Sequence, residues 1–319
     1  MWLYHLRRYL YQYNFCEERR LGNSPLLMTI TKLQGGLGNQ MFQYATARGC
    51  SPNEIITVDL SFLENNTTST DAFTSRKYRL DVFEHISVNV LKPFRRKIIT
   101  DSGLGYRLLK KLMWNGLKTI GDHNTSPAVH LNLKGKSAIY LDGYFQNEAY
   151  FNHIRPLLLH EFSFPELPEK LALMMNNIKA HKTSVAIHVR QGDYLKPGIV
   201  SYHGVLPLSY YTNAIAYMGK LTTDAHYFIF SDNMPWCRGC FAFLKDSVTF
   251  TDAGEQDWID MALMSSCSHQ VIANSSFSWW AAWLNPSCEK IVIAPKKWFA
   301  DSSAINQAEN IVPNNWIKI

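Results

Sequence analysis

What this 319-residue sequence has little of excludes several classes of protein. Its six cysteines are too sparse for a disulfide scaffold in a chain of this length. No run approaches the roughly 20 apolar residues that a helix needs to cross a bilayer. Lysine and arginine form no dense stripe that could follow a phosphate backbone, so we expect no nucleic-acid partner. The net charge of +6 is a modest excess that suits a small anionic ligand.

Residues 1–27 lack the continuous apolar core of a secretory signal, because charged side chains interrupt their aromatic clusters. We therefore expect a cytoplasmic protein with no transmembrane segment, and leave peripheral membrane association and oligomeric state undecided. Met28 opens a strand, a glycine-rich turn and a helix, and the preceding residues fit no part of this pattern. We expect residues 1–27 to be an extension outside the core fold.

Metal-binding patterns are also missing. No Asp-x-Asp follows a strand, which is the arrangement that many metal-dependent transferases use to hold a divalent ion. Cys237 and Cys240 have redox spacing, but no thioredoxin-sized β–α–β unit surrounds them, and no second Cys or His pair stands at zinc spacing. The nearest acidic cluster, at 252–260, has the pattern of a helix start. The sequence therefore predicts no metal ion and no bound cofactor.

Strand-like and helical patterns alternate in the second half of the chain, which predicts an α/β fold with a parallel sheet. Strand-like runs stand at 54–60, 137–145, 183–190, 226–232, 247–252, 269–275 and 290–295. Pro165 and Pro168 mark a linker, so we expect an N-terminal domain over 28–165 and a C-terminal domain over 166–319. Residues 88–125 have a helical and basic pattern, but their packing does not follow from it.

The first candidate site is the strand end in the segment SVAIHVRQGDY. Strand alternation places His188 and Arg190 on one face, at the carboxyl end where parallel sheets bind ligands. The rigid guanidinium fork of Arg190 matches the oxygens of a phosphate two at a time. Asp193 follows, where it orients Arg190 or caps the next turn. The alternative is an ordinary salt bridge at a strand end.

The second candidate is the helix start in the segment HQVIANSSFSWWAAWLNP. A buried strand ends at Ala273, and Asn274, Ser275 and Ser276 lead into a helix that begins at Phe277. Hydroxyl groups and free backbone N–H groups at a helix start form an anion site. The alternative is simple N-capping by the same residues. We expect the three tryptophans of this helix to lie in the core.

The third candidate is the segment GGLGNQMFQY, whose glycines allow a ligand to approach the backbone between a strand and a helix. Gly36 and Gly38 also fit the start of a dinucleotide fingerprint, with Asp59 as the acid that binds ribose. Met41 stands at the third glycine position, where it spoils the close packing of helix on strand. An NAD(P) oxidoreductase is therefore kept only as a rival interpretation.

Together these segments resemble the bacterial α-1,2-fucosyltransferase family, whose motifs occur here in the same order between residues 35 and 284. The family's glycine-rich motif is matched at 35–45 and its central His-x-Arg-Arg-x-Asp motif at 188–193. Its Phe-Ser-Asp strand end is matched at 230–232, and its late Asn-Ser-(Ser/Thr)-Phe-Ser-Trp-Trp motif at 274–280. Four ordered motifs are much more specific than any one of them.

Two positions depart from the family pattern. Gln191 replaces the second arginine of the central motif, while Arg190 keeps the first, which binds the β-phosphate in related enzymes. Asn233 stands where the family often has a further aspartate. The resemblance does not say how these departures affect donor binding.

The resemblance implies a GT-B fold, in which two Rossmann-like domains face each other across a cleft. It implies an inverting transfer of L-fucose from GDP-β-L-fucose to the 2-hydroxyl of a terminal β-galactoside, in a surface polysaccharide or oligosaccharide. The donor substrate binds mainly to the C-terminal domain and the galactoside acceptor mainly to the N-terminal one. Neither a metal nor a further cofactor is implied.

The resemblance also assigns roles to residues. Arg190 and Asn39 are expected to be catalytic. The expected donor-binding residues are His188, Arg190, Asp193, Ser231, Asp232, Asn274, Ser275, Ser276 and Phe277. The expected residues on the acceptor or cleft side are Gly36, Gly38, Asn39 and Gln40. The general base is not identified, because a salt bridge to arginine would lower the basicity of Asp193. A non-catalytic sugar-binding protein is the second rival.

Overall fold

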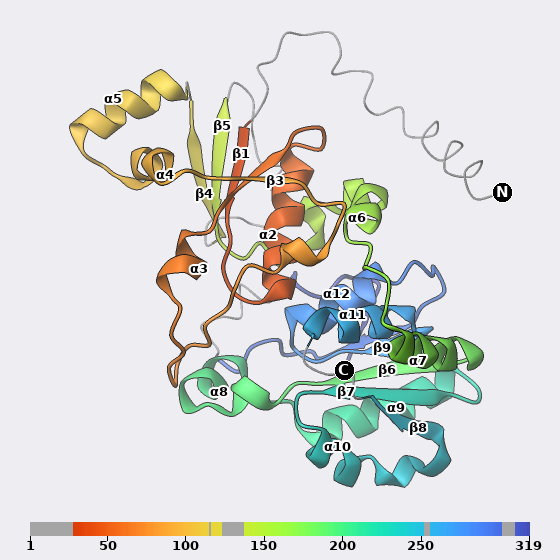
Figure 1. The fold of residues 1–319 in the computed structure, drawn as a ribbon. Coiled ribbons are helices and arrows are strands. Elements are labelled where there is room, and N and C mark those ends of the chain that lie inside the picture. The colour runs from red at the N-terminus through yellow and green to blue at the C-terminus, as the bar shows by residue number, and fades with distance from the viewer. Residues whose placement is uncertain (1–27, 115, 123–136, 252–255, 302–309) are drawn as a thin grey trace, which may run out of the picture.

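The computed structural model describes the chain except for residues 1–27, 115, 123–136, 252–255 and 302–309 (Figure 1). The predicted extension at 1–27 therefore lies outside the described residues. The described part contains two parallel sheets, one from each half of the chain. The predicted α/β class with parallel sheets is confirmed. The boundary between residues 165 and 166 stays a prediction.

The first sheet is built from five parallel strands, and its central strand is β1. The strand order is β3 (Val88–Val90), β2 (Ile56–Asp59), β1 (Met28–Lys32), β5 (Ala138–Asp142) and β4 (Lys118–Gly121). Helix α2 packs on one face through the core that contains Val58 and Leu141. Helices α4 and α5 cover the other face, where Ile30 and Tyr140 lie. Burial on both faces explains the largely apolar β5.

The second sheet is built from six parallel strands, with β6 and β9 at its centre. The strand order is β11 (Ile317–Lys318), β10 (Val292–Ala294), β9 (His269–Val271), β6 (Ser184–Val189), β7 (His226–Ser231) and β8 (Val248–Phe250). The alternation predicted along β6 is confirmed. Val185 and Ile187 face the cluster with α9 and α10, whereas Ala186 faces the cluster with α7, α11 and α12.

The helices alternate with the strands along the chain. The α-helices are α2 (Leu37–Cys50), α3 (Ser61–Asn65), α4 (Pro93–Thr100), α5 (Leu104–Met113), α6 (Arg155–Glu161), α7 (Glu169–Ala180), α8 (Pro197–His203), α9 (Leu208–Leu221), α10 (Met234–Cys240), α11 (Asp257–Ser266) and α12 (Ser276–Leu284). The short 3₁₀ helices are Leu80–Val82, Glu148–Tyr150, Asn152–Ile154, Gly192–Leu195 and Ala242–Ser247. This regular order gives helices on both faces of each sheet, as parallel strands require.

The two halves share one hydrophobic core. Helix α12 of the second half lies against α2 of the first (Figure 1). The ring centroid of Phe42 on α2 is 4.4 Å from that of Trp279 and 5.0 Å from that of Trp280. Trp279, Trp280 and Trp283 are buried, so their prediction as core residues is confirmed. This aromatic contact fixes how the two sheets meet.

Candidate functional site

Two strand ends bring an arginine and a carboxylate together. Strands β6 and β7 are in parallel register, with His188 opposite Phe230 and Val189 opposite Ser231. The next residue of each strand, Arg190 and Asp232, therefore lies at the same carboxyl edge. Nη1 of Arg190 is 2.9 Å from Oδ2 of Asp232, and each side chain is 25% exposed. The edge thus presents a fixed cation to solvent, at the place where parallel sheets bind ligands.

Both oxygens of the Asp232 carboxylate are engaged. Oδ1 accepts a hydrogen bond from the backbone N–H of Gln191 at 2.9 Å, and Oδ2 faces Arg190. A Cβ atom at Gly192 would lie 2.4 Å from Oδ2, so only glycine fits under this carboxylate. Asp232 thus holds the 190–192 turn, and its expected contact with the donor stays a prediction. The side chain of Asp193 lies outside the described part of the structure, so its predicted contact with Arg190 stays a prediction.

His188 is a neutral imidazole beside this ion pair. The side chain is buried, and its ring centroid is 5.6 Å from that of Phe277 at the start of α12. Burial, and secondly the charge of Arg190, lower the pKa of His188 to about 3, although Asp232 acts in the opposite direction. Its Nδ1 atom is buried without a hydrogen-bond partner among the described residues. Such an orphaned polar atom indicates a place for a ligand or water.

The two departures from the family pattern contact each other. Nδ2 of Asn233 donates a hydrogen bond to Oε1 of Gln191 at 2.9 Å. The backbone N–H of Asn233 donates to Oγ of Ser231 at 2.9 Å, and Oδ1 of Asn233 caps α10. A neutral amide pair thus stands where the family motif places an arginine and an aspartate. Both departures therefore belong to one local arrangement at the edge of the sheet.

The start of α12 is capped by its own residues. Ser275 is the N-cap, and its Oγ accepts a hydrogen bond from the N–H of Phe277 at 3.3 Å. Asn274 is buried, and its Nδ2 donates to the carbonyl oxygens of His203 and Trp298. Ser275 therefore caps the helix, as the alternative interpretation predicted. Asn274 holds neighbouring loops together through its hydrogen bonds. Ser276 is half-buried at the first turn of the helix.

The glycine-rich turn of the first half reaches the start of α12. Gly35 has φ of +78°, which favours glycine, and leads into α2. A Cβ atom at Gly38 would lie 2.6 Å from the backbone carbon of Ser276 and 2.7 Å from the nitrogen of Phe277. Gly38 therefore admits another part of the protein, whereas we predicted that it admits a ligand. The two helix N-termini consequently meet at one place.

Two polar side chains of this turn differ in their roles. Gln40 is fully buried, and its Nε2 donates to the carbonyl oxygens of Gly35 and Lys77. Its Oε1 accepts from the backbone N–H of Arg79, so its side chain is occupied in structure and not directed at a ligand. This placement corrects the prediction that Gln40 lines the cleft. Asn39 is half-buried and accepts a hydrogen bond from Gln146 at 2.8 Å.

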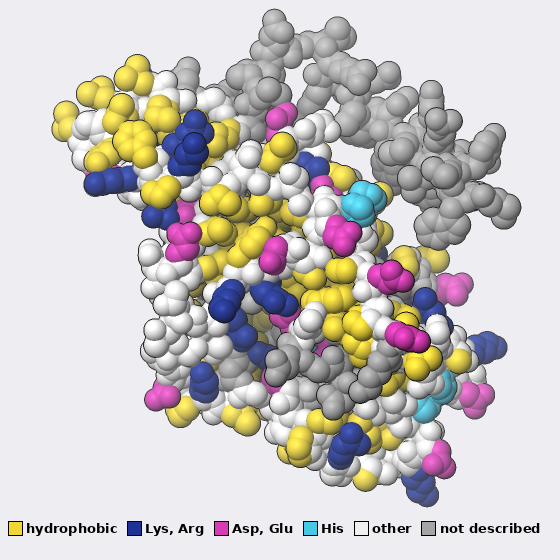
Figure 2. All heavy atoms as spheres, in the orientation of Figure 1, with side chains coloured by type: hydrophobic (Ala, Val, Ile, Leu, Met, Phe, Trp, Pro, Cys, Tyr) yellow, Lys and Arg dark blue, Asp and Glu magenta, His cyan; other side chains and the backbone are white. Residues whose placement is uncertain are grey.

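Sequence reasoning missed the loop between α3 and the 3₁₀ helix at Leu80–Val82. Arg79 pairs with Asp257 at the start of α11, which joins the two halves. A Cβ atom at Gly36 would lie 3.9 Å from Nε of Arg76, so this arginine stands beside the glycine-rich turn. Figure 2 shows Lys and Arg side chains gathered in the middle of the face shown, between the regions of α2 and α8. The sequence shows two arginines at 76 and 79, but no local pattern predicts that they lie beside the glycine-rich turn and α11.

The structure does not support the residues that a dinucleotide-binding site or a cysteine redox site would need. Asp59, the acid that a dinucleotide enzyme would use for ribose, is fully buried and accepts a hydrogen bond from the hydroxyl of Tyr140 at 2.7 Å. Cys237 is buried, and burial raises the pKa of its thiol to about 11, which opposes thiolate chemistry at neutral pH. Neither residue can take the role that the rival reaction requires.

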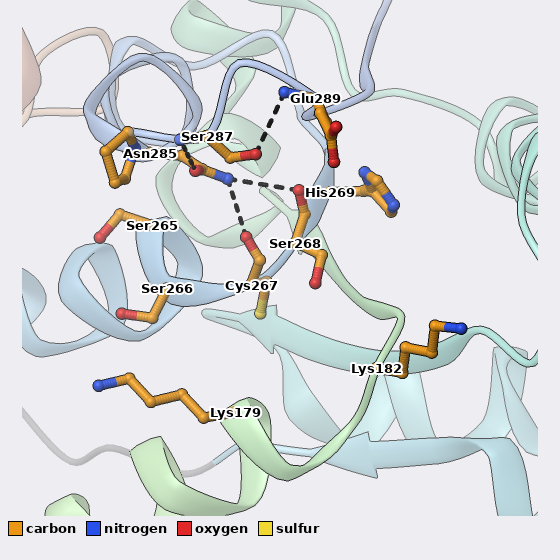
Figure 3. Close-up of a pocket in the computed structure, with 11 residues that line it drawn as sticks. Lys179, Lys182, Ser265, Ser266, Cys267, Ser268, His269, Asn285, Ser287 and Glu289 are labelled. Carbon is orange, nitrogen blue, oxygen red and sulfur yellow. Dashed lines mark hydrogen bonds between the residues drawn. The ribbon is translucent and has the colours of Figure 1, made fainter.

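A separate hollow lies at the opposite edge of the second sheet (Figure 3). It is lined by Lys179, Lys182, Ser265, Ser266, Cys267, Ser268, His269, Asn285, Pro286, Ser287 and Glu289. Its residues stand at the amino ends of β6 and β9. Nδ2 of Asn285 donates to the carbonyl oxygen of Cys267 at 2.8 Å, so this side chain has a structural role. Because ligands of parallel sheets bind at the carboxyl edge, we place the site at Arg190.

Two further properties concern only the residues that the structure describes. Within them, no group of three or more His, Cys, Asp or Glu side chains is arranged to hold a metal ion. No helix in the same part of the chain combines the length and the apolar character needed to cross a membrane.

Comparison with known proteins gives matches over nearly the whole chain. The model of glycosyl transferase family 11 matches residues 3–319. The O-antigen biosynthesis glycosyltransferase WbnK of Escherichia coli is 31% identical over 90% of this chain and 99% of its own. An α-1,2-colitosyltransferase of Escherichia coli is 28% identical over 92% of this chain and 99% of its own. Galactoside α-(1,2)-fucosyltransferase 1 of Gorilla gorilla gorilla is 28% identical over 47% of this chain and 44% of its own.

Solved structures give weaker similarity. A mutant of FUT1 from Arabidopsis thaliana in complex with GDP matches with a TM-score of 0.49 and 12% identity, covering 92% of this chain and 75% of that one. The fucosyltransferase NodZ from Bradyrhizobium matches with a TM-score of 0.43 and 14% identity, covering 83% of this chain and 95% of that one.

Proposed function

The chain belongs to glycosyl transferase family 11, and from this premise we propose that it is an inverting α-1,2-fucosyltransferase. The reaction moves L-fucose from GDP-β-L-fucose to the 2-hydroxyl of a terminal β-galactoside in a surface polysaccharide or oligosaccharide. Two of the three relatives named above carry names that specify an α-1,2 linkage, and one of these names specifies a galactoside. These names support the linkage and the acceptor class.

The observation that carries the proposal is the position of Arg190. Its guanidinium is held by Asp232 at the carboxyl edge of the second sheet, beside the buried His188. A guanidinium has five N–H donors, so the pair with Asp232 does not prevent donation to phosphate oxygens. The N-termini of α2 and α12 meet nearby and add their positive dipole ends. The arrangement suits a nucleoside diphosphate.

The proposed chemistry is a single displacement at the anomeric carbon of fucose. The acceptor oxygen forms a bond to C1 as the bond from C1 to the phosphate oxygen breaks, which turns the β-linked donor into an α-linked product. Positive charge grows on the sugar, as in glycoside hydrolysis, while the departing GDP takes the electron pair. Arg190 stabilises this negative charge in the transition state.

The acceptor hydroxyl also loses a proton, which passes to a base. His188 is a poor candidate, because a pKa of about 3 makes its imidazole a weak base at neutral pH. Its neutral form suits a hydrogen bond to the nucleotide through the orphaned Nδ1 atom. We propose that His188 and Ser276 bind the donor. We propose that Asn39, across the α2–α12 contact, orients the reacting groups.

The test is transfer by an Arg190→Ala variant, measured as GDP released from GDP-fucose with lactose present. We expect turnover to fall by about 100-fold to 1,000-fold, since loss of one charge-stabilising donor costs roughly 3–4 kcal/mol. Arg238→Ala removes an exposed arginine of α10 and should leave turnover unchanged. Near-normal turnover of Arg190→Ala would remove this arginine from the mechanism.

A donor and acceptor panel tests the finer parts of the proposal. The similarity to an α-1,2-colitosyltransferase favours a colitose donor as the second candidate. Transfer from the GDP-linked forms of both sugars should be compared with the same galactoside acceptor. Linkage analysis of the product should show fucose on the 2-hydroxyl of galactose. Donor hydrolysis that no acceptor stimulates would instead contradict the transferase assignment.

A further inference from the structure

Helix α5 turns apolar side chains away from the protein. Leu104, Leu108 and Leu112 lie one turn apart along the helix and are 78%, 61% and 82% exposed. Single exposed leucines are common, but a row of three along a ten-residue helix is a continuous apolar stripe. Such a stripe indicates a surface that binds a partner or a membrane.

Other residues attach α5 to the protein, so the leucines are not needed for this purpose. Tyr106 packs against the core cluster of the first sheet, in which Trp114 is buried just after the helix end. Nζ of Lys110 donates a hydrogen bond to the carbonyl oxygen of Ile99 on α4 at 2.7 Å. The inner face of α5 is therefore fixed, and the leucine stripe points outward.

Basic side chains surround the stripe. Residues 92–113 contain seven lysines and arginines and a single acidic residue, Asp101. On the helix, Arg107 and Lys111 lie beside the leucine row, and both are exposed. In Figure 2, hydrophobic and basic side chains gather at the corner where Figure 1 shows α4 and α5. An apolar stripe with a basic border is the pattern of a helix that lies in a membrane interface.

We propose that α4 and α5, named here the α4–α5 arm, dock on a bilayer that contains anionic lipids. The leucine stripe enters the boundary between headgroups and acyl chains, and the basic residues contact the headgroups. Phe94 on α4 is 64% exposed and adds a large apolar side chain to the arm. This binding surface goes beyond the proposed sugar transfer, and neither depends on the other.

Charge complementarity selects this occupant over two others. A second copy of the chain would bring an equally basic arm against this one, and the two would repel. Residues 1–27 contain four arginines against two glutamates, so they also carry positive charge. An anionic lipid surface is the one of the three that complements both the leucines and the basic border.

The test is sedimentation of the full chain with lipid vesicles. We expect binding to vesicles of phosphatidylcholine mixed with phosphatidylglycerol, weaker binding at high salt, and little binding to pure phosphatidylcholine. The variant Leu104→Ser/Leu108→Ser/Leu112→Ser should lose affinity by about tenfold or more, because three apolar side chains leave the interface. The matched control Leu173→Ser/Leu221→Ser changes exposed leucines of α7 and α9 and should bind as the wild type does.

Each alternative has a recognisable outcome. If the wild type does not bind anionic vesicles, or if the control loses as much affinity as the stripe variant, the proposal is wrong. A change of mass in solution in the stripe variant would assign the stripe to contact between copies. A photo-crosslinking residue at position 112 should label lipid, and labelling of residues 1–27 instead would overturn the proposal. If the stripe variant does not fold, Arg107→Glu/Lys111→Glu should bind anionic vesicles more weakly than the wild type, and unchanged binding would overturn the proposal.

Discussion

Two ion pairs of the same chemistry, one in each half, differ in their exposure to solvent. Arg48 and Glu161 of the first half have side chains that are 16% and 6% exposed, and Nη2 lies 2.6 Å from Oε1. Glu161 also accepts a hydrogen bond from the hydroxyl of Tyr44, and burial raises the pKa of that hydroxyl. Arg190 and Asp232 of the second half are each 25% exposed at a strand end. The first pair is enclosed by protein, whereas the second borders solvent.

Burial, more than pairing, distinguishes an ion pair that is enclosed by protein from one that a ligand can reach. A buried pair has no surface left for substrate, and removal of one partner leaves an uncompensated charge. A pair at the edge of a sheet borders solvent, so an anion can approach it while the pair holds its geometry. Changes in the first pair should therefore affect stability, and changes in the second should affect catalysis.

The largest expected effect is on stability. Glu161→Ala should lower the free energy of unfolding by about 3–5 kcal/mol, because Arg48 and Tyr44 lose their buried partner. Turnover per folded molecule should not change. Urea unfolding measures the first and GDP release the second. As a control, Glu64→Ala removes an exposed carboxylate and should cost no more than about 0.5 kcal/mol. A folded but inactive Glu161→Ala variant would contradict the structural role of the Arg48–Glu161 pair.

The second effect is on catalysis. Asp232→Asn should lower turnover by about tenfold to 100-fold, because Arg190 is no longer held in place by charge. The unfolding free energy should change little for a pair that borders solvent. Asp246→Asn, at an exposed aspartate of the same half, is the matched control. If the variant loses stability and keeps its turnover, the second pair is structural like the first.

The third effect is the dependence of stability on pH. The pKa of His188 is lowered to about 3 in the folded protein and is near 6.5 in the unfolded chain, which therefore binds more protons between these values. The stability from neutral His188 is complete above pH 6.5 and is lost as the pH falls toward 3. Its contribution to the slope is at most about 1.4 kcal/mol per pH unit.

Comparison with a His188→Gln variant isolates this contribution from the carboxylates that titrate in the same range. Unfolding free energies of both proteins should be measured at several pH values between 3 and 6.5. The slope should be smaller in the variant. Equal slopes would mean that His188 is accessible to water and titrates normally.

The fourth effect concerns the amide pair of Gln191 and Asn233, which stands next to the Arg190–Asp232 ion pair. Gln191→Arg alone should cost about 1 kcal/mol of stability, because it loses the 2.9 Å hydrogen bond to Asn233. Adding Asn233→Asp should recover this cost by making an ion pair in its place. A double-mutant cycle with urea unfolding measures the coupling. If the two changes are additive, these residues are not one unit.

Removal of divalent cations is expected to have no effect on activity. Transfer should proceed unchanged in EDTA, because the proposal assigns the charge of the departing GDP to Arg190 and the helix N-termini. Activity that falls in EDTA and returns with a divalent cation would show that a metal shares this role.

Part of the site followed from the sequence and part did not. Arg190 and Asp232 each come directly after an apolar strand, so their place at a carboxyl edge was predictable. Which carboxylate contacts Arg190 depends on the register of β6 against β7, which pairs segments far apart along the chain. Local spacing suggested Asp193, whose contact with Arg190 stays a prediction, and the register brings in Asp232.

Burial was the property that sequence patterns predicted least well. Gln40 belongs to a motif that suggested a cleft, but a loop from residues 77–79 passes over it and takes its hydrogen bonds. The helical pattern of residues 88–125 is confirmed only for α4 and α5, because strands β3 and β4 stand at its two ends. The pattern also did not say which face of α5 packs inward. Tyr106 and Trp114 take the inner positions, which leaves the leucines outside. Which face of a helix is buried depends on the side chains of the elements that pack against it, and these can lie far away in the sequence.

The most direct measurement is a crystal structure of the protein with GDP. We expect the guanidinium of Arg190, still paired with Asp232, to donate hydrogen bonds to the β-phosphate at the carboxyl edge of the second sheet. If GDP lies there with Arg190 turned away from both phosphates, or if it binds at the opposite edge of that sheet, the central claim is contradicted.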